Sequence, residues 1–514
     1  MTRRSFVLGS ASFAAAAMLS TTRLTGAAAE ATPKLPSYPF ALGVASGDPA
    51  PSSVVIWTRL APKPLEPGGG MPAAPVVVWW EVANDEQFKS VVRSGTTFAT
   101  PHWGHSVHIE VEGLRPDRWY WYRFRAAGEV SPTGRTRTLP PAGATPDRLR
   151  FAFASCQHYE TGLFTAYEHL AREDLDLVVH LGDYIYEGAA QAGRVRRHNS
   201  TEIKTLDEYR ARYALYRLDP ALQKAHAHAP WILTWDDHEV ANNYAGDIPE
   251  RAVPREEFLL RRAAAYQAYF EMMPLRRSAQ PKGPDMLLYR RLAFGRLASF
   301  HVLDTRQYRT DQPQGDGRKP WSDVLLDPKG TLLGEQQRQW LYSGLERSPA
   351  GWNILAQQVM MAPVDRTPGP ETGFSMDQWP GYEFERRATL RHFAERKIKN
   401  PVVLTGDIHS NWANELVTDV NRPDSPSTGV EFVGTSITSG GDGIDQPKGT
   451  ADLQAENPFV KYHNTERGYV RCEVTPGRWT ADYRTLPYVT RPGAPITTRA
   501  SFVVESGRPQ LHRA

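Results

Sequence analysis

Side chains that bind metal ions stand just after several apolar runs of the sequence. One polar residue at a strand end is common in any α/β protein, but here four predicted strand ends carry such groups. They are Cys156; Asp183 and Tyr186; Asp236 to Glu239; and Asp407 and His409. Solvation alone is a poor explanation for four such sets, so they predict one shared metal centre. Neighbouring cations repel each other, so an anionic oxygen must lie between them, and Asp183 is the natural bridge.

Three of these side chains favour a transition metal. Cys156 offers a thiolate, Tyr186 a phenolate and His409 an imidazole, and anionic sulfur and oxygen donors of this kind suit ferric iron. A lone cysteine after a strand is usually a small buried apolar residue, so Cys156 is assigned as a ligand only because of its neighbours.

The other predicted ligands are hard oxygen donors. Asp237, Asp407 and an amide oxygen such as that of Asn243 suit a hard ion such as calcium. Spacing does not choose between Asn243 and its neighbour Asn242, so this ligand stays open between the two.

Such a centre suits the hydrolysis of phosphoric esters. It activates a bound water or oxo ligand as nucleophile and clamps a phosphoryl group in line. His238 and Arg306 are the predicted catalytic residues, since they can hold the phosphate oxygens as charge grows or protonate the leaving group. A surface ion pair is the alternative for Arg306.

The sequence around these residues predicts the strands and helices of an α/β fold. A strand at 149–156, a helix at 163–172 and a strand at 175–181 predict a βαβ unit. Its parallel strands would deliver Cys156 and Asp183 side by side, at the edge where open α/β sheets bind ligands. Further apolar strands follow near 231–235, 300–304, 353–362 and 401–406.

The N-terminal third has a different pattern. Residues 38–138 show short alternating strands with Pro and Gly between them, which predicts an all-β sandwich. The aromatic strand after Gly113 resembles the tyrosine corner of fibronectin-like and immunoglobulin-like domains. We expect an N-terminal domain at 30–140, a catalytic domain at 148–490 and a C-terminal tail at 491–514, with a linker at 140–146.

The first residues predict export. Arg3 and Arg4 precede Phe-Val-Leu and a short apolar run, and Ala27-Ala28-Ala29 offers a cleavage site, which together resemble a twin-arginine signal peptide at 1–29. An ordinary signal peptide with coincidental arginines is the alternative. No other segment reaches spanning length, so we expect a soluble periplasmic or secreted protein that uses the twin-arginine export machinery.

The overall composition limits the kinds of partner that the protein is expected to bind. The chain has 514 residues with 60 basic and 57 acidic side chains, and this balance gives no reason to propose a nucleic-acid partner. Its two cysteines do not make a disulfide scaffold. We expect Cys472 and His180 to be core residues, and the Gly- and Ser-rich segment 436–443 to be a flexible loop in preference to a phosphate cradle.

These motifs resemble the PhoD-like alkaline phosphatase family, a branch of the calcineurin-like metallophosphoesterases. The matching motifs are Ser155-Cys156-Gln157, Gly182-Asp183-Tyr184-Ile185-Tyr186-Glu187, Trp235-Asp-Asp-His-Glu239 with Asn242-Asn243, Asp304-Thr-Arg306-Gln-Tyr308 and Gly406-Asp-Ile-His409. The resemblance implies a four-layer α/β/β/α metallophosphoesterase sandwich after an all-β fibronectin- or immunoglobulin-like domain. It also implies an exported phosphatase that scavenges phosphate.

The resemblance further implies a site with one ferric ion and calcium. Position by position, the iron shell corresponds to Cys156, Asp183, Tyr186 and His409, and the calcium side to Asp183, Asp237, Asn243 and Asp407. The substrate would be a small-molecule phosphomonoester, with phosphodiesters left open.

Two rival functions remain at this point. One is a phospholipase D-like or teichoic-acid phosphodiesterase on the same scaffold, which only a comparison of substrates would separate. The other is a non-catalytic calcium-stabilised protein that binds surfaces or carbohydrate through its β-sandwich. A full ligand set together with an arginine suited to phosphate argues against the second.

Overall fold

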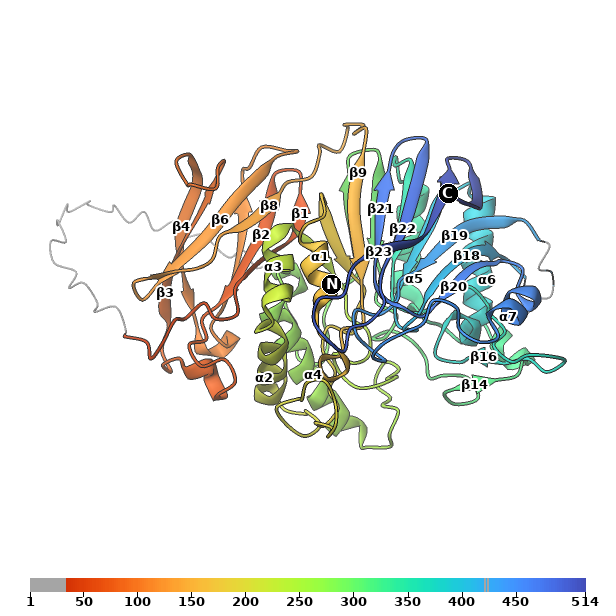
Figure 1. The fold of residues 1–514 in the computed structure, drawn as a ribbon, viewed down its shortest axis with the longest axis horizontal. Helices are drawn as coiled ribbons and strands as arrows, with labels where there is room; N and C mark the ends of the chain where they lie inside the picture. The colour runs from red at the N-terminus through yellow and green to blue at the C-terminus, as the bar shows by residue number, and fades with distance from the viewer. Residues whose placement is uncertain (1–33, 420–421, 423–424) are drawn as a thin grey trace, which may run out of the picture. The chain divides into compact units, whose positions relative to one another are not determined.

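Two β-sheets packed face to face form the centre of the fold (Figure 1). In this computed structural model, residues 34–514 are described, apart from 420–421 and 423–424. The predicted export signal at 1–29 therefore lies outside the described residues. Residues Leu35–Ala514 form one compact unit, which contains both sheets.

The first sheet has ten strands, and its middle strands β9, β10, β11 and β1 run parallel. In spatial order they are β24 (Arg508–Arg513), β23 (Thr497–Glu505), β22 (Arg478–Leu486), β21 (Arg467–Val474), β9 (Leu149–Ala154), β10 (Leu177–His180), β11 (Trp231–Leu233), β1 (Val44–Ala50), β2 (Ser53–Arg59) and β5 (Ser106–Glu112).

The second sheet has seven strands, and β13, β15, β17 and β19 run parallel. In spatial order they are β12 (Arg290–Phe294), β13 (Ala298–Val302), β15 (Trp352–Ala356), β17 (Pro401–Thr405), β19 (Ser427–Val433), β18 (Asn411–Val417) and β20 (Val460–Asn464). A small ribbon of β14 (Arg318–Lys319) and β16 (Phe374–Ser375) lies apart.

Successive side chains of a strand point to opposite faces of its sheet, so each central strand contributes to two core layers. In β9, Phe151 and Phe153 join the core between the two sheets, whereas Ala152 and Ala154 join the core beneath the helices. Because both faces of such a strand are buried, its sequence is almost continuously apolar.

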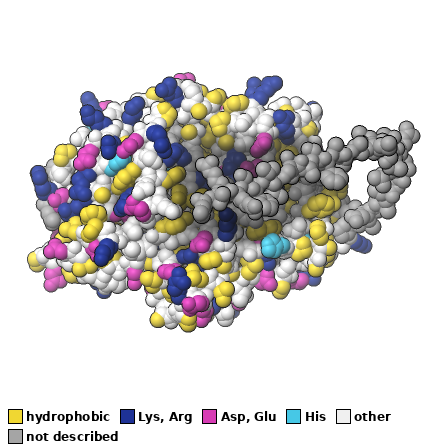
Figure 2. Space-filling model, turned by 180° about the vertical axis from the view of Figure 1, so that it is seen from behind, with side chains coloured by type: hydrophobic (Ala, Val, Ile, Leu, Met, Phe, Trp, Pro, Cys, Tyr) yellow, Lys and Arg dark blue, Asp and Glu magenta, His cyan; other side chains and the backbone are white. Residues whose placement is uncertain are grey.

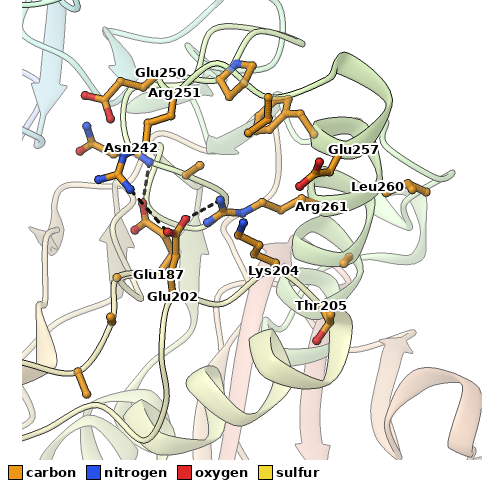
Figure 3. Close-up of a pocket in the computed structure, with 18 of the residues that line it drawn as sticks. Glu187, Glu202, Lys204, Thr205, Asn242, Glu250, Arg251, Glu257, Leu260 and Arg261 are labelled. Carbon is orange, nitrogen blue, oxygen red and sulfur yellow. Dashed lines mark hydrogen bonds and ion pairs between the residues drawn. The ribbon is translucent and has the colours of Figure 1, made fainter.

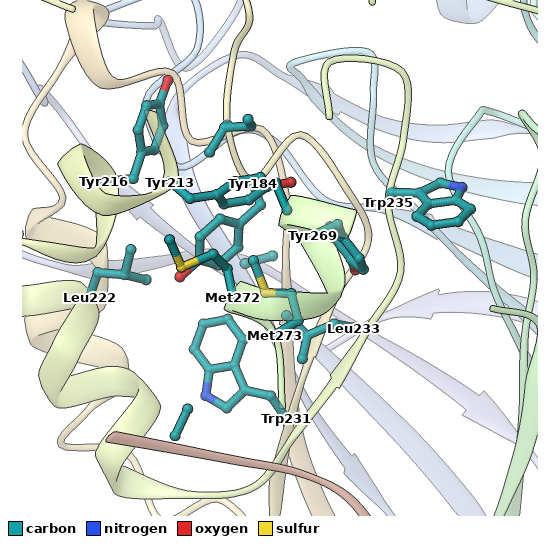
Figure 4. Packing of buried hydrophobic residues seen from close by; sticks show 14 of the residues in the cluster. Tyr184, Tyr213, Tyr216, Leu222, Trp231, Leu233, Trp235, Tyr269, Met272 and Met273 are labelled. Atoms are coloured by element: carbon teal, nitrogen blue, oxygen red, sulfur yellow. The ribbon is translucent and has the colours of Figure 1, made fainter. Parts of the chain in front are cut away.

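Helices cover the outer faces of both sheets (Figure 1). Those on the first sheet are α1 (Thr165–Leu170), α2 (Leu206–Arg217), α3 (Pro220–His228) and α4 (Arg255–Met272), and those of the second half are α5 (Gly334–Glu346), α6 (Glu383–Glu395) and α7 (Thr450–Glu456). Tyr213, Leu222 and Tyr269 from the first group pack around Trp231 of β11 (Figure 4). The expected four-layer α/β/β/α fold is confirmed.

The N-terminal region is an all-β sandwich, as expected. Its outer sheet contains β4 (Val91–Ala99), β3 (Val76–Ala83), β6 (Trp119–Ala126), β7 (Glu129–Val130) and β8 (Gly134–Arg137). The hydroxyl of Tyr120 accepts from the Arg115 backbone N–H at 2.9 Å and donates to the Arg115 carbonyl at 3.2 Å, which is the geometry of a tyrosine corner.

The N-terminal sandwich and the C-terminal segment both contribute strands to the ten-stranded sheet. The inner layer of the sandwich, β1, β2 and β5, continues the ten-stranded sheet, with Gly47 of β1 opposite Trp231 of β11. The segment 491–514, expected to be a tail, contains β23 and β24, because alternate residues such as Phe502 and Val504 enter the core between the sheets. The exact domain boundaries stay predictions.

Cys472 and His180 are fully buried, which confirms them as core residues. No helix in the described part of the chain is both long and apolar enough to cross a membrane. Figure 2 shows basic and acidic side chains interspersed over the described part of one face.

Candidate metal centre

The predicted ligands meet where the carboxyl ends of the two parallel sheets face each other. Cys156, Asp183 and Asp237 come just after β9, β10 and β11 of the first sheet, and Asp407 comes just after β17 of the second. The ligand atoms form three overlapping groups in which every pair lies within 4.8 Å. The groups are Cys156, Asp183 and His409; Asp183, Asp237 and His238; and Asp236, Asp237 and Asp407.

The backbone turns sharply at five positions in and next to this centre. Cys156, Asp183, Asn243, Asp407 and His409 all have φ between 48° and 62°, in the left-handed region. Non-glycine residues adopt this conformation only when their surroundings compensate, and such residues concentrate at functional sites. Gly182 precedes one turn with φ of 111°, and a Cβ there would lie 2.4 Å from the backbone nitrogen of Asp236.

The predicted iron side is closely packed. The Tyr186 hydroxyl donates to Asp183 Oδ2 at 2.7 Å and lies 3.1 Å from His409 Nε2. His409 Nε2 is itself 3.8 Å from Asp183 Oδ2. Cys156 is buried beside them, and its Sγ contacts Ser155 Oγ at 3.2 Å. The four predicted side chains are thus brought together.

The predicted calcium side is assembled less completely. Asp237 and Asp407 lie in one group together with Asp236. Asn243 donates its backbone N–H to Asp237 Oδ2 at 2.7 Å, but its side-chain amide nitrogen turns to Asp316 Oδ2 at 2.6 Å. Asn242 instead donates its backbone N–H to Glu187 Oε1 at 2.7 Å. Of the two asparagines, Asn243 is the one bonded to a predicted ligand.

Arg306 is buried among carboxylates. Its guanidinium donates to Asp236, to both oxygens of Asp377 at 2.9 Å, and to Asp407 at 3.3 Å. The carboxylates raise the pKa of Arg306, although burial opposes them. The side chain is fully inaccessible to solvent. In this arrangement it serves the carboxylates and is not free to contact a phosphate.

His238 is poised between acids and remains partly exposed. Its Nδ1 lies 2.7 Å from Glu187 Oε2, and its ring packs against Tyr186 with centroids 4.1 Å apart. Burial lowers the pKa of His238, but the carboxylates of Asp237, Glu187 and Asp183 outweigh it, so the pKa stands well above the ordinary value. A protonated imidazole at this position is able to donate a proton.

The donor set fits bound cations. Asp183 Oδ1 and Asp236 Oδ2 are buried and have no hydrogen-bond partner within the described residues. Burial and the nearby Asp183 raise the pKa values of the Cys156 thiol and the Tyr186 phenol. Burial also raises the pKa of Asp407 to about 6, against the effect of Arg306. A cation reverses such shifts, because it stabilises the anionic form of every ligand around it.

Three residues of the centre were missed from the sequence, and a fourth, Glu239, was predicted only as one of a set of strand-end side chains. Asp377 holds Arg306, and Gln378 donates to Asp407 Oδ2 at 2.9 Å. Glu239 accepts the backbone N–H groups of Asp183 and Asp236 at 3.1 and 2.8 Å, so it fixes two strand ends together. Asp377 and Gln378 lie in a long connection with no strand-end pattern, so no local signal pointed to them.

The third missed residue, Ser439, lies in the segment 436–443, for which the sequence predicts a flexible loop. Ser439 Oγ donates to the backbone oxygen of Cys156 and contacts Tyr186 Oη, each at 2.7 Å. Residues Ser436 and Ser439 are buried. This part of the segment therefore packs against the predicted iron side, because its hydroxyl groups satisfy polar atoms there.

Known proteins resemble this chain over nearly its whole length. A family model described as PhoD-like phosphatase matches residues 151–483, and the model of the N-terminal domain of the same phosphatases matches residues 26–140. Alkaline phosphatase D of Bacillus subtilis (strain 168) is 53% identical over 518 residues, covering 99% of this chain and 89% of that protein. A solved structure described as PhoD superposes with a TM-score of 0.91 at 54% identity, covering 94% of this chain and 93% of the other.

Proposed function

The chain belongs to the PhoD-like phosphatase family, and from that premise we propose that it is a metal-dependent phosphoesterase whose metal centre lies between the two sheets. The observation that carries the proposal is the sharing of carboxylates. Asp183 belongs to two of the three ligand groups and Asp237 to two. Shared anionic ligands are what adjacent cations require.

We assign ferric iron to the group of Cys156, Asp183, Tyr186 and His409. Sulfur, phenolate and imidazole donors support this choice, and calcium suits the oxygen donors of Asp183, Asp237 and Asp407 together with Asn243. For Asn243 to bind an ion through its amide oxygen, the side chain can keep its donor bond to Asp316. When bound, such ions polarise the phosphoryl group and lower the pKa of a water nucleophile.

The chain's own residues supply the proton chemistry and the positioning. His238, held by Glu187, is proposed as the acid that protonates the departing alkoxide. The sequence predicts Arg306 as a phosphate clamp. Its contacts with Asp236, Asp377 and Asp407 instead support a role in positioning these carboxylates. A phosphate would have to displace those carboxylates to reach it.

The proposed substrates are phosphomonoesters at neutral to alkaline pH. The name of the Bacillus subtilis relative supports an alkaline phosphatase. The paired Arg3 and Arg4 and the Ala-rich segment support export by the twin-arginine route, to the periplasm or beyond the cell.

The first test compares two buried cysteines. Cys156→Ala removes a proposed iron ligand, whereas Cys472→Ala removes a thiol from the core between the sheets. We expect Cys156→Ala to lose iron and at least about 100-fold in kcat for p-nitrophenyl phosphate, since a lost ligand removes the metal and its activation of water. Cys472→Ala should keep both.

Two further measurements complete this test. Wild-type protein should lose activity in the presence of a chelator, and elemental analysis should find iron and calcium. Iron bound to phenolate or thiolate should absorb visible light. Normal hydrolysis by a Cys156→Ala, Asp183→Ala double variant would refute the metal mechanism, and a colourless, iron-free active enzyme would refute the iron assignment.

A further inference from the structure

A cavity of about 720 Å³ lies beside the N-terminal half of α4 (Figure 3). Glu187 and Asn242 line it, and Glu187 is the residue whose Oε2 lies 2.7 Å from His238 Nδ1. One carboxylate therefore separates the cavity from the proposed acid. A volume of this size matches the pockets that bind organic molecules of roughly 300–1,000 Å³.

Part of the cavity wall is apolar and comes mainly from α4. Phe258, Leu260 and Ala264 line it together with Val253, which precedes the helix. Leu260 is 74% exposed and Val253 is 38% exposed. Large apolar side chains that remain exposed around a hollow mark a binding surface more often than isolated ones do.

Two of the acidic residues that line the cavity, Glu187 and Glu202, have charged partners. Glu202 pairs with Arg261 at 2.7 Å and faces Arg251 at 3.8 Å, as the dashed lines in Figure 3 show. Glu187 is paired with His238 and accepts the Asn242 backbone N–H. An apolar group can therefore enter beside these two carboxylates without removing their partners, while Lys204 offers a donor for a hydroxyl or anionic oxygen.

We propose that this cavity is a subsite for the alcohol part of the phosphoester and that it selects substrates with a bulky, partly apolar alcohol. The proposal rests on the proposed phosphoesterase function. The phosphoryl group would lie at the metal centre, and the alcohol would extend past Glu187 and Asn242 towards Leu260 and Ala264. His238, bonded to Glu187, would then lie beside the leaving oxygen.

The test uses two substrates with similar leaving oxygens, phenyl phosphate and biphenyl-4-yl phosphate. Ala264→Trp fills the cavity from α4, and Ala263→Trp adds the same bulk at the adjacent position, which does not line it. We expect Ala264→Trp to raise KM for the biphenyl ester about tenfold, as hydrophobic discrimination in a pocket allows, and to leave KM for phenyl phosphate nearly unchanged. Ala263→Trp should change neither.

A second variant keeps the proposal testable if Ala264→Trp does not fold. Leu260→Ala removes an exposed apolar contact, and Leu65→Ala is its control, because Leu65 is 42% exposed in the N-terminal region. Leu260→Ala should raise KM for the biphenyl ester several-fold and leave KM for phenyl phosphate unchanged. Leu65→Ala should change neither KM.

The outcomes separate the two proposals. Equal changes for both substrates, or none for either, in Leu260→Ala would overturn the subsite. Wild-type protein that hydrolyses neither ester would instead overturn the proposed function. Metal content and Tm of each variant should match wild type, so that a changed KM reports the cavity alone.

Discussion

Arg306 shows how one side chain can hold together groups that repel each other. Four buried or nearly buried carboxylates, those of Asp236, Asp237, Asp377 and Asp407, lie within 4.0 Å of its guanidinium. An arginine can satisfy several carboxylates because its five N–H donors point in fixed directions. The position of Asp407 next to the proposed calcium ligands therefore depends on a residue that need not bind the ion.

Asp377→Asn tests this dependence. The substitution keeps the shape of the side chain but leaves Arg306 and Arg309 without their shared anion. Breaking a buried pair costs about 3–5 kcal/mol, so we expect a lower Tm, together with weaker calcium binding and lower kcat.

Glu383→Gln provides the matched control. Glu383 forms an equally buried pair with Arg386, but it lies on α6 outside the centre. The Glu383→Gln substitution should lower Tm without lowering the calcium content or the kcat of the folded protein. Asp377 would have only a structural role if both variants lost stability and neither lost calcium.

At the scale of single elements, the strands that carry ligands are buried on both faces. In β10, His180 lies between Trp231 and Tyr184, with ring centroids 6.0 and 5.3 Å away. Its Nε2 is buried without a hydrogen-bond partner among the described residues. Burial lowers the pKa of His180 to about 3, so the imidazole is neutral in the folded chain.

Because His180 is buried in its neutral form, we expect the folded protein to lose stability as the pH falls. Between about pH 6.5 and pH 3 the unfolded chain binds a proton at His180 that the folded chain does not, so stability falls as pH decreases. The loss is about 1.4 kcal/mol per pH unit over that window. His180→Phe should remove this part of the slope.

Denaturant unfolding of wild type and His180→Phe at several pH values measures the difference. The two proteins should differ least above pH 7, apart from a constant offset, and the variant should gain relative stability as pH falls. Parallel curves for the two proteins from pH 7 to pH 4 would contradict the assignment.

At the scale of the whole molecule, the metal centre joins the two sheets. The first sheet supplies Cys156, Asp183 and Asp237, and the second supplies Asp407 and, shortly after it, His409. Ions bound there would link the two halves of the sandwich. Ligands that bind only the folded state stabilise it, by about 2.7 kcal/mol at 100 times the dissociation constant.

Metal removal should therefore lower the thermal stability of the full-length protein. We expect a chelator to reduce Tm by several degrees, and added calcium and iron to restore it. Calorimetry of wild type and Asp183→Asn measures this, since the variant lacks the bridging ligand and should respond much less. An unchanged Tm after the ions are shown to be removed would contradict a linking role.

Beyond the four-layer arrangement, which the family resemblance implied, the sequence alone predicted an α/β fold, the sandwich at the N-terminus and the side chains that gather at the strand ends. Each of these follows from local pattern, because alternation decides which faces are buried and a polar residue after an apolar run marks a strand end. The same reasoning located Cys156, Asp183 and His409 correctly beside one another.

Only the tertiary structure decided which distant segments complete the centre. Asp377 and Ser439 reach it from connections far along the chain, and Arg306 is surrounded by carboxylates from three separate segments. The joining of β1 to β11 likewise depends on a contact between residues 47 and 231. Local pattern specifies the face and the end of each strand, but long-range packing selects the loops that meet there, and burial then determines which charges must pair.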